Sequence, residues 1–368
     1  MSVKIICVAG ARPNFMKIAP IMEALRAQPG IESLLVHTGQ HYDEKMSDLF
    51  FRELGIPQPD MNLEVGSGSH AVQTAEIMRA FEPVCLNHKP DWVLVVGDVN
   101  STIACGLVAV KLGIKLIHVE AGLRSGDRTM PEEINRILTD SISDLLFCTE
   151  RSGVENLRRE GIDPKKIHLV GNVMIDTLLK NRDKAEQSTV LDQMGLKAGG
   201  YATMTLHRPS NVDEPAAFSN ILEAVDAIQR ELPIVFPIHP RTRKNIASLG
   251  FGNRVAAMPG LRLIDPIGYL DFLKLNTHAR VILTDSGGLQ EESTILRVPC
   301  ITIRENTERP ITCEVGSNQL AGTSTRAILA AYENVKSGAF GHRRIPDLWD
   351  GRAAVRIARI LAGLAPDS

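Results

Sequence analysis

Short apolar runs of strand length alternate along the chain with segments whose apolar residues recur at helical spacing. Runs rich in Val, Ile and Leu are typical of strands that are buried on both faces of a parallel sheet. The first five predicted strands are Lys4–Val8, Trp92–Val96, Ile114–Val119, Leu145–Cys148 and Ile167–Val170. This alternation predicts a parallel sheet covered by helices, and it argues against a β-sandwich or a helix bundle.

A second series of strands follows a polar stretch at 180–200, which closes with two glycines. The pattern predicts an α/β fold with two doubly wound, Rossmann-like domains, residues 1–179 and 180–350, facing a central cleft. The terminal helix 351–368 is assigned to the first domain, although its apolar spacing fits either. The second series comprises Tyr201–Leu206, Ile234–Ile238, Arg262–Ile264, Val281–Leu283 and Cys300–Ile303.

The composition excludes several classes of partner. The 41 Lys and Arg residues nearly balance 43 Asp and Glu residues in 368, which gives a net charge of -2 and no basic footprint for nucleic acid or an anionic membrane. No apolar run approaches the roughly 20 residues of a membrane span. The first residues enter a strand without the pattern of a secretory signal, so we expect a cytoplasmic protein.

The loop after the first predicted strand contains Gly10 but lacks the further glycines of a dinucleotide-binding fingerprint. We therefore expect no NAD. Arg12 and Lys17 stand where a helix begins at the sheet edge, a place that suits a diphosphate. The alternative is that both are solvated cations.

Three acidic residues follow strands or begin a helix in the first half of the chain. Asp98, Asn100 and Ser101 are all candidates for one helix N-cap, which leaves Asp98 available to a ligand. Glu120 comes directly after a mostly apolar strand, where a carboxylate can take part in proton transfer. Glu132 lies just after Pro131, and from the residues alone it is better explained as part of an acidic helix start.

Histidines follow two strands of the second half. His207 and His239 each come at a strand end and are followed closely by arginine, without carboxylates spaced for metal binding. The six cysteines show no CxxC spacing. We therefore expect ligand contacts from the histidines and no metal site.

The most specific single element is the stretch Thr284–Glu292, which reads TDSGGLQEE. Ser286, Gly287 and Gly288 lie between a strand and a helix, where backbone amides at a helix N-terminus bind phosphate. Because carboxylates facing that phosphate would repel it, at least one of the two that follow should face neutral hydroxyls such as those of a ribose. The pattern predicts a nucleotide diphosphate in the second domain.

The motifs taken together resemble those of the non-hydrolysing UDP-N-acetylglucosamine 2-epimerases, which have a GT-B type of fold. The resemblance covers most of the chain in the same order. It is carried by GARPNFMKIAP, TGQHYDEKM, VGDVNST, HVEAGLRSGDRTMPEEINR, VGNVMIDTL, HRPSN, TDSGGLQEE, RENTERPIT and LAGT.

This resemblance implies that UDP is eliminated from the sugar as the C2 proton leaves, and that UDP adds back to a 2-acetamidoglucal after reprotonation on the other face. Such an activity supplies precursors for cell-surface polysaccharide. It implies a UDP-sugar substrate, no cofactor, and a homodimer. By position, the acid/base and sugar-facing residues are Asp98, Glu120, Glu132 and Lys17, with His207 beside the diphosphate; the UDP-binding residues are Arg12, Ser286, Gly287, Gly288, Glu292 and Arg309.

Departures from the family pattern leave the substrate and the regulation open. This chain has HRPSN where many members have HRREN, and Met130 where many have an aromatic residue. The substrate is thus UDP-N-acetylglucosamine or a modified sugar such as a UDP-2,3-diacetamido uronic acid. Some members bind a second substrate molecule as an activator. Here Gln40, His41, Arg208 and His239 are present, but Tyr42, Asp43 and the arginine-free stretch 63–70 differ, so we expect that activation to be absent or altered.

Two other function classes fit the fold. A retaining glycosyltransferase of the same fold would leave C2 of the sugar untouched, because fold alone does not determine chemistry. A non-catalytic nucleotide-sugar sensor would bind without turnover, but it gains nothing from three carboxylates facing the sugar.

Overall fold

The computed structural model describes residues 2–39, 54–55, 58–340 and 344–364, and it omits the side chains of Arg12 and Pro13. The chain forms two compact units. Unit 1 comprises Met1–Lys180 and Asp347–Ser368, and unit 2 comprises Asn181–Pro346. Both units are parallel sheets with helices, so the predicted α/β class with two Rossmann-like domains is confirmed.

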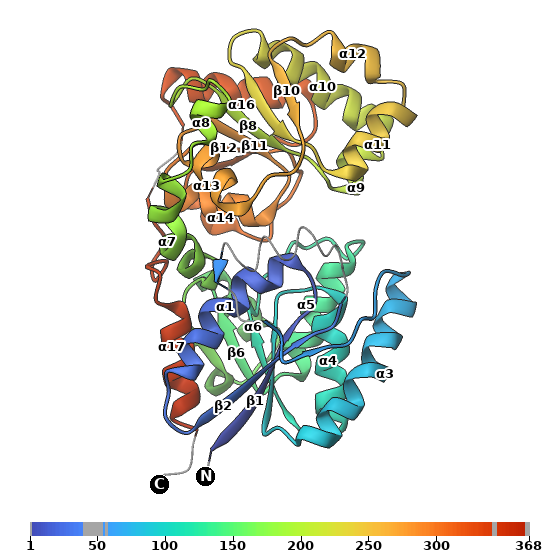
Figure 1. The fold of residues 1–368 in the computed structure, drawn as a ribbon, viewed down its shortest axis with the longest axis vertical. Coiled ribbons are helices and arrows are strands. Elements are labelled where there is room, and N and C mark those ends of the chain that lie inside the picture. Colours follow the sequence, from blue (N-terminus) through green and yellow to red (C-terminus); the bar gives the residue numbers. More distant parts are fainter. Residues whose placement is uncertain (1, 40–53, 56–57, 341–343, 365–368) are drawn as a thin grey trace. The chain divides into compact units, whose positions relative to one another are not determined.

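Unit 1 has a seven-stranded parallel sheet in the order β3-β2-β1-β4-β5-β6-β7 (Figure 1). The order reverses between β1 and β4, which is where ligands bind in doubly wound sheets. The strands are β1 (Val3–Ala9), β2 (Ile31–His37), β3 (Met61–Asn62), β4 (Trp92–Val96), β5 (Lys115–Val119), β6 (Leu145–Cys148) and β7 (Ile167–Leu169). The helices are α1 (Arg12–Arg26), α3 (His70–His88), α4 (Asn100–Lys111), α5 (Pro131–Ile142), α6 (Arg151–Arg159), α7 (Val173–Glu186) and α17 (Ala353–Ala362).

Unit 2 repeats this plan with a six-stranded parallel sheet in the order β10-β9-β8-β11-β12-β13. Its order reverses between β8 and β11. The strands are β8 (Ala202–Thr205), β9 (Ile234–Pro237), β10 (Leu261–Ile264), β11 (Val281–Thr284), β12 (Cys300–Thr302) and β13 (Asn318–Leu320). The helices are α8 (Val190–Gln193), α9 (Pro209–Val212), α10 (Pro215–Gln229), α11 (Pro240–Ser248), α12 (Gly252–Ala256), α13 (Tyr269–Thr277), α14 (Gly287–Leu296), α15 (Pro310–Glu314) and α16 (Thr325–Ser337).

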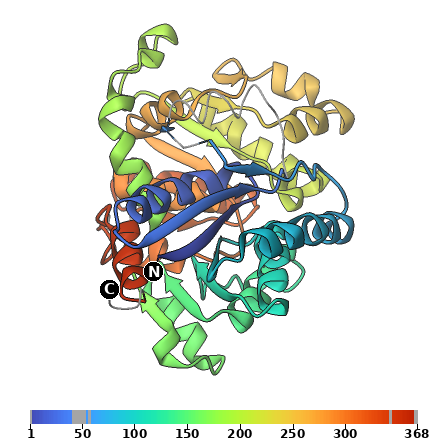
Figure 2. The ribbon, with the colours of Figure 1, turned by 60° about the horizontal axis from the view of Figure 1, so that its bottom comes forward.

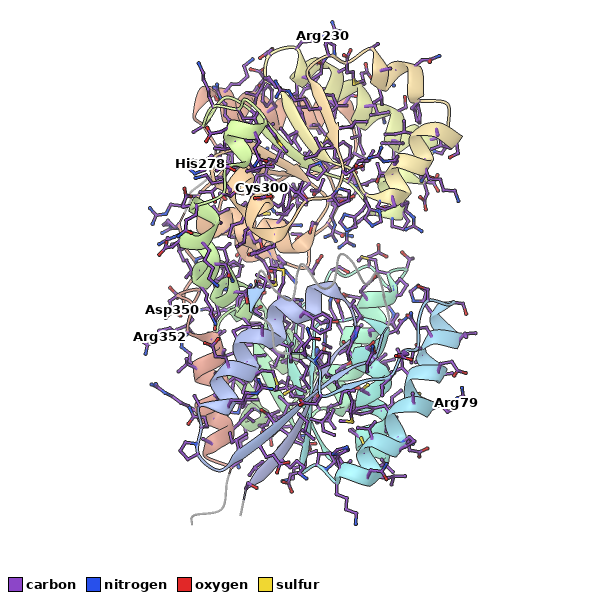
Figure 3. All side chains as sticks on the ribbon, in the orientation of Figure 1. Arg79, Arg230, His278, Cys300, Asp350 and Arg352 are labelled. Carbon is purple, nitrogen blue, oxygen red and sulfur yellow. The ribbon has the colours of Figure 1, made fainter. Side chains whose placement is uncertain are left out.

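The buried strands match the apolar runs of the sequence, because both faces of each sheet are covered. Every residue of β4 and β6 is buried. Cys300, which is labelled in Figure 3, is fully buried at the start of β12. The sequence analysis did not predict β2, β3 or β13. The first half of β2 contains Glu32 and Ser33 among apolar residues and is only partly buried. A search for continuous apolar runs therefore does not find this strand.

The terminal segment is fastened to unit 1 by specific contacts. Asp176 accepts hydrogen bonds from the backbone amides of Ala353 (3.1 Å) and Ala354 (2.7 Å), which caps the start of α17. Buried Trp349 donates from Nε1 to the Thr149 carbonyl at 3.0 Å. α17 then packs along α1, as Figures 1 and 2 show. Of the helices in the described ranges, none is both long and apolar enough to cross a membrane.

Candidate active site

The loop between β1 and α1 is held to the end of β4 by one buried side chain. Asn14 Oδ1 accepts the backbone N–H groups of Gly10 (3.1 Å) and Ala11 (2.9 Å), and its Nδ2 donates to the Val96 carbonyl at 3.1 Å. Lys17 lies one turn further along α1 and is also buried. The loop thereby delivers Lys17 to the point where the strand order reverses. The side chain of predicted Arg12 lies outside the described part of the chain.

Glu120 occupies a strained position directly after β5. Its φ is 71°, in the left-handed region that costs a residue with a Cβ about 1 kcal/mol and is found mainly at functional sites. Its carboxylate is buried and forms an ion pair with Lys17 Nζ, although the two residues are 103 apart in the chain. A buried ion pair on strained backbone is a costly arrangement, which indicates that this carboxylate has a task at the site.

A glycine brings the ends of β4 and β5 together with Lys17. Gly97 has φ 72°, and a Cβ placed there would lie 3.3 Å from both Glu120 Oε2 and Lys17 Nζ. Its amide donates to the Val119 carbonyl at 3.0 Å. The absence of a side chain at this position leaves room for the Lys17–Glu120 pair.

Asp98 follows Gly97, but it does not cap α4. The N-cap residue is Val99, with no side-chain cap, so the prediction that Asp98, Asn100 or Ser101 caps this helix is wrong. Asp98 Oδ2 instead accepts a hydrogen bond from Arg136 Nη2 at 2.5 Å. The aspartate is half-buried and stays at the carboxyl edge of the sheet, one strand away from Glu120.

The two glutamates at the start of α5 have different surroundings. Glu132 is half-buried, whereas Glu133 is buried and accepts the backbone amides of Ser125 and Gly126, each at 2.9 Å. Glu133 also pairs with Arg136 Nη1 at 2.9 Å. Burial would raise the pKa of Glu133, but the two amides and the Arg136 guanidinium together hold it below its usual value.

The sequence analysis missed the polar stripe on the buried face of α5. Glu133, Arg136 and Asp140 recur at intervals of three and four, so they share one face of the helix, and all three are buried. The spacing was visible in the sequence, but it is ordinarily a sign of a solvated face. Here the stripe connects α5 to Asp98 and to the loop before the helix.

In unit 2, Asp285 organises the ends of β8 and β11. This buried carboxylate accepts the backbone amides of His207 and Arg208, each at 2.9 Å, and His207 Nδ1 lies 2.9 Å from Oδ1. Burial would raise the pKa of Asp285, but the His207 ring and these amides lower it overall. Asp285 orients His207, whose side chain remains partly exposed at the edge of the sheet. The sequence analysis quoted Asp285 within its motif without giving it a role.

The predicted anion nest lies at the start of α14, with Ser286 as N-cap residue and Gly287 and Gly288 as the first two helical residues. A Cβ on Gly287 would lie 2.7 Å from Glu308 Oε1, so this position admits no side chain without movement of that carboxylate. Predicted Arg309 is buried beside the nest and forms an ion pair with Glu291 Oε1 at 2.5 Å. Glu291 is thereby engaged by a cation.

Glu292, the second carboxylate of the pair, has a different partner. Tyr269 donates from its hydroxyl to Glu292 Oε1 at 3.2 Å, and the glutamate is buried. Burial raises the pKa of Glu292 to about 7, and the Tyr269 hydrogen bond opposes that shift. A carboxyl group with a pKa of about 7, on the helix that begins with the anion nest, is suited to hydrogen bonds with uncharged hydroxyls.

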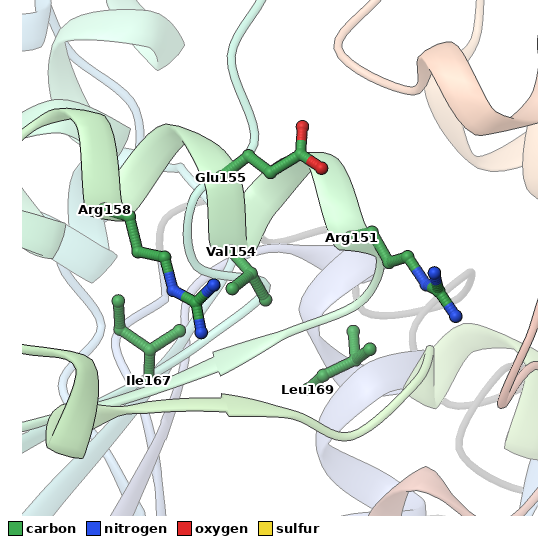
Figure 4. Close-up of a pocket in the computed structure, with 6 residues that line it drawn as sticks. All are labelled: Arg151, Val154, Glu155, Arg158, Ile167 and Leu169. Atoms are coloured by element: carbon green, nitrogen blue, oxygen red, sulfur yellow. The ribbon is translucent and has the colours of Figure 1, made fainter.

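Two hollows on unit 1 are lined by other residues than the predicted ones. One, of about 300 Å³, lies between α6 and β7; in Figure 4, Arg158 reaches over Ile167 while Glu155 points the other way. The other, of about 450 Å³, lies among α3, α4 and α5. Asn135 lines this second hollow and also donates to the Asp98 carbonyl at 2.8 Å, so it connects the hollow to the backbone of Asp98.

Comparison with known proteins identifies the family. The family model described as UDP-N-acetylglucosamine 2-epimerase matches residues 23–362. The chain belongs to the UDP-N-acetylglucosamine 2-epimerase family. The resemblance inferred from the motifs is thus confirmed.

Members of the UDP-N-acetylglucosamine 2-epimerase family resemble this chain over nearly its whole length. A UDP-N-acetylglucosamine 2-epimerase of Methanococcus maripaludis is 44% identical over 360 residues, which cover 96% of this chain and 98% of the relative. The UDP-2,3-diacetamido-2,3-dideoxy-D-glucuronate 2-epimerase of Pseudomonas aeruginosa is 41% identical over 370 residues, which cover 98% of this chain and all of the relative.

A solved structure of the family is also similar to this chain. The crystal structure of the Methanocaldococcus jannaschii UDP-GlcNAc 2-epimerase in complex with UDP-GlcNAc and UDP has a TM-score of 0.91 and 43% identity. The match covers 98% of this chain and 100% of the chain in that structure. This likeness agrees with the predicted GT-B class of fold.

Proposed function

We propose that this enzyme interconverts UDP-N-acetylglucosamine and UDP-N-acetylmannosamine by epimerisation at C2, and so supplies precursors for cell-surface polysaccharide. The observation that carries the proposal is the buried Lys17–Glu120 ion pair beside the Gly97–Asp98 turn. It places a buried, ion-paired carboxylate after β5, the strand beside the one that leads to Asp98, in a chain 44% identical to a named epimerase. An epimerase needs proton donors and acceptors for two faces of one carbon, and these carboxylates supply them.

The proposed reaction has two balanced steps. A carboxylate takes the C2 proton, the C–H electron pair forms the C1–C2 double bond, and the C1–O bond breaks so that UDP leaves with its electron pair. The resulting 2-acetamidoglucal is reprotonated at C2 from its other face while a UDP oxygen adds to C1. All electrons stay within the sugar nucleotide, so the proposal involves no NAD and no metal.

Under this proposal, the carboxylates of unit 1 act on the sugar, and UDP is bound by residues of unit 2 together with Arg12. Asp98, Glu120 and Glu132 serve as acid and base groups, and Lys17 forms the buried ion pair with Glu120. The amides at the start of α14, with His207, Arg12 and Arg309, stabilise the departing diphosphate. Glu292 accepts hydrogen bonds from the ribose hydroxyls.

Deuterium exchange tests the proposal. Incubation with UDP-N-acetylglucosamine in D2O should place deuterium at C2 of the recovered substrate and of the product, as measured by NMR and mass spectrometry. A glycosyltransferase would leave C2 unlabelled, and a sensor would bind without turnover. Absence of C2 deuterium with every UDP-2-acetamido sugar tried would falsify the proposal.

A second substrate is favoured by the Pseudomonas aeruginosa relative, which is 41% identical and is named for a UDP-2,3-diacetamido uronate. That sugar carries an acetamido group at C3 and a carboxylate at C5, but the chemistry at C1 and C2 is the same. Parallel D2O incubations with both nucleotide sugars, compared by kcat/KM, decide between the two substrates.

Nucleotide affinity should depend on pH through Glu292. As the pH falls from about 8 to about 6, this carboxyl gains its proton and becomes a weaker acceptor, so the Kd of a UDP-sugar should rise about fivefold. Calorimetry with UDP-glucose measures the change, because its diphosphate keeps a constant charge over this range. Glu292→Gln should bind more weakly at pH 8 and lose that part of the pH dependence; an unaltered pH profile in this variant would contradict the role.

Allosteric activation by a second substrate molecule is predicted to be absent or altered. Gln40, His41, Tyr42 and Asp43 lie outside the described residues, while Arg208 is held against Asp285 by its amide and side chain. We expect rates that depend hyperbolically on UDP-N-acetylglucosamine concentration. Strongly sigmoidal kinetics that become hyperbolic in His239→Asn would overturn this expectation.

We also propose a homodimer, located in the cytoplasm, where the six free cysteines stay reduced. The supporting feature is a set of exposed apolar side chains on α3, α4 and α5. Of these helices, α3 packs against α4, and α4 packs against α5. The exposed side chains are Val72, Leu86, Val110 and Leu138. Sedimentation should give a dimer, and Leu138→Glu should shift it toward monomer, whereas Leu263→Glu on unit 2 should not.

A further inference from the structure

A buried histidine lies between the strand ends that carry the acid and base candidates. His118 is fully buried in β5, two residues before Glu120. Its Nε2 lies 2.8 Å from the Gly97 carbonyl oxygen, and its Nδ1 lies 2.6 Å from Asp140 Oδ1. A carbonyl oxygen only accepts hydrogen bonds, so Nε2 carries a hydrogen.

The second ring nitrogen faces a carboxylate that is already engaged by donors. Asp140 Oδ2 accepts the Gly122 amide at 3.0 Å and lies 2.8 Å from Arg124 Nη1. An ionised Asp140 satisfies these contacts, whereas a neutral carboxylic acid is a poorer partner for an arginine. With Asp140 ionised, Nδ1 must also donate, and His118 is an imidazolium.

The charges around this ring come from several elements. Asp140 lies on α5, and Arg124, in the loop before it, also binds Glu160 after α6 at 2.6 Å and 2.9 Å. On the other side of Gly97 is the Lys17–Glu120 pair. Two carboxylates, Asp140 and Glu160, thus balance the two cations His118 and Arg124, and a buried cation needs such an anion nearby.

We propose that His118 is a doubly protonated positioning residue that fixes the Gly97–Asp98 turn relative to Glu120 and α5. One ring connects the backbone immediately before Asp98, the strand that leads to Glu120, and the helix that carries Glu132 in its first turn. A neutral imidazole carries one N–H group and cannot donate to both acceptors. The role in positioning rests on the proposed epimerase function, while the protonation state does not.

Spectroscopy of the full-length wild-type enzyme tests the protonation state without reference to activity. In ¹⁵N-histidine-labelled protein, long-range ¹H–¹⁵N correlation spectra should show both His118 ring nitrogens protonated at pH 7. The signal is assigned by its loss in His118→Gln. An unprotonated ring nitrogen at pH 7, in the wild type, overturns the inference.

Kinetics test the positioning role. His118→Gln keeps one amide donor but loses the charge, and we expect kcat for C2 exchange to fall about 10²-fold with KM changed less than about threefold, as displaced catalytic groups would give. The matched control is His168→Gln in β7, a half-buried histidine outside the site, which should leave both constants unchanged. A His118→Gln enzyme with wild-type kcat overturns the inference; a wild-type enzyme without C2 exchange overturns the proposed function instead.

Discussion

Glu120→Gln should lower kcat for C2 deuterium exchange by about 10³-fold, because the carboxylate that the fold holds on strained backbone can no longer accept or donate the proton. The same change leaves the Lys17 ammonium buried without its anion. Removing one partner of a buried pair costs about 3–5 kcal/mol, so the variant should also melt at a lower temperature. Exchange measured by NMR and unfolding measured by circular dichroism report the two effects separately.

A double variant separates the chemistry from the stability. Lys17→Met with Glu120→Gln removes both charges, so most of the lost stability should return while activity stays low. Glu76→Gln, on the exposed face of α3 beside Arg79, is the matched control and should change neither property. Recovery of activity in the double variant would contradict an acid/base role for Glu120. The loss in Glu120→Gln would then come from the unpaired Lys17 ammonium.

The neighbouring glutamates at the start of α5 should give opposite results. Glu133→Gln replaces a carboxylate that accepts two backbone amides and pairs with Arg136, so one amide loses its acceptor and the buried guanidinium keeps only Asp98 as its anion. We expect a loss of about 2–4 kcal/mol in the free energy of unfolding. Because the pKa of Glu133 is lowered in the fold, this stabilisation is present at neutral pH and is lost as the pH falls through the lowered value.

Glu132→Gln, one residue away, should lower kcat about 10²-fold or more with little change in the free energy of unfolding. Glu132 is half-buried and is not engaged with the loop amides that Glu133 binds. Urea unfolding and C2 exchange on both variants make the comparison. The assignment fails if Glu132→Gln is the less stable variant or if Glu133→Gln is fully stable.

The sequence predicted which residues stand at the strand ends, because a buried parallel strand is a local apolar run and the next one or two residues reach the edge of the sheet. Glu120 after β5, His207 after β8 and Ser286 after β11 follow from this rule. The role of a residue stayed ambiguous where a local task such as helix capping explained it as well as ligand binding did. Asp98 is the example: it was one of three candidates for the N-cap of α4, but Val99 holds that position and the carboxylate binds Arg136 on α5.

Two of the residues that the sequence analysis missed, Asp140 and Asp285, act through partners distant in the chain. Asp140 binds His118 at a separation of 22 residues, and Asp285 binds the His207 amide at a separation of 78. Periodicity indicates which face of its own element a residue occupies, but it does not indicate what lies opposite. For this reason the sequence analysis gave no role to the stripe of Glu133, Arg136 and Asp140.

The sequence by itself determined the α/β class, the two-series organisation, and, through its motifs, the family. Those properties depend on local apolar patterning and on short motifs. Only the tertiary structure decided that Lys17 pairs with Glu120, that Arg309 pairs with Glu291 while Glu292 faces Tyr269, and that Gly97 leaves the space for the first pair. These are contacts between side chains brought together by sheet order, and their energies depend on burial that no local pattern contains.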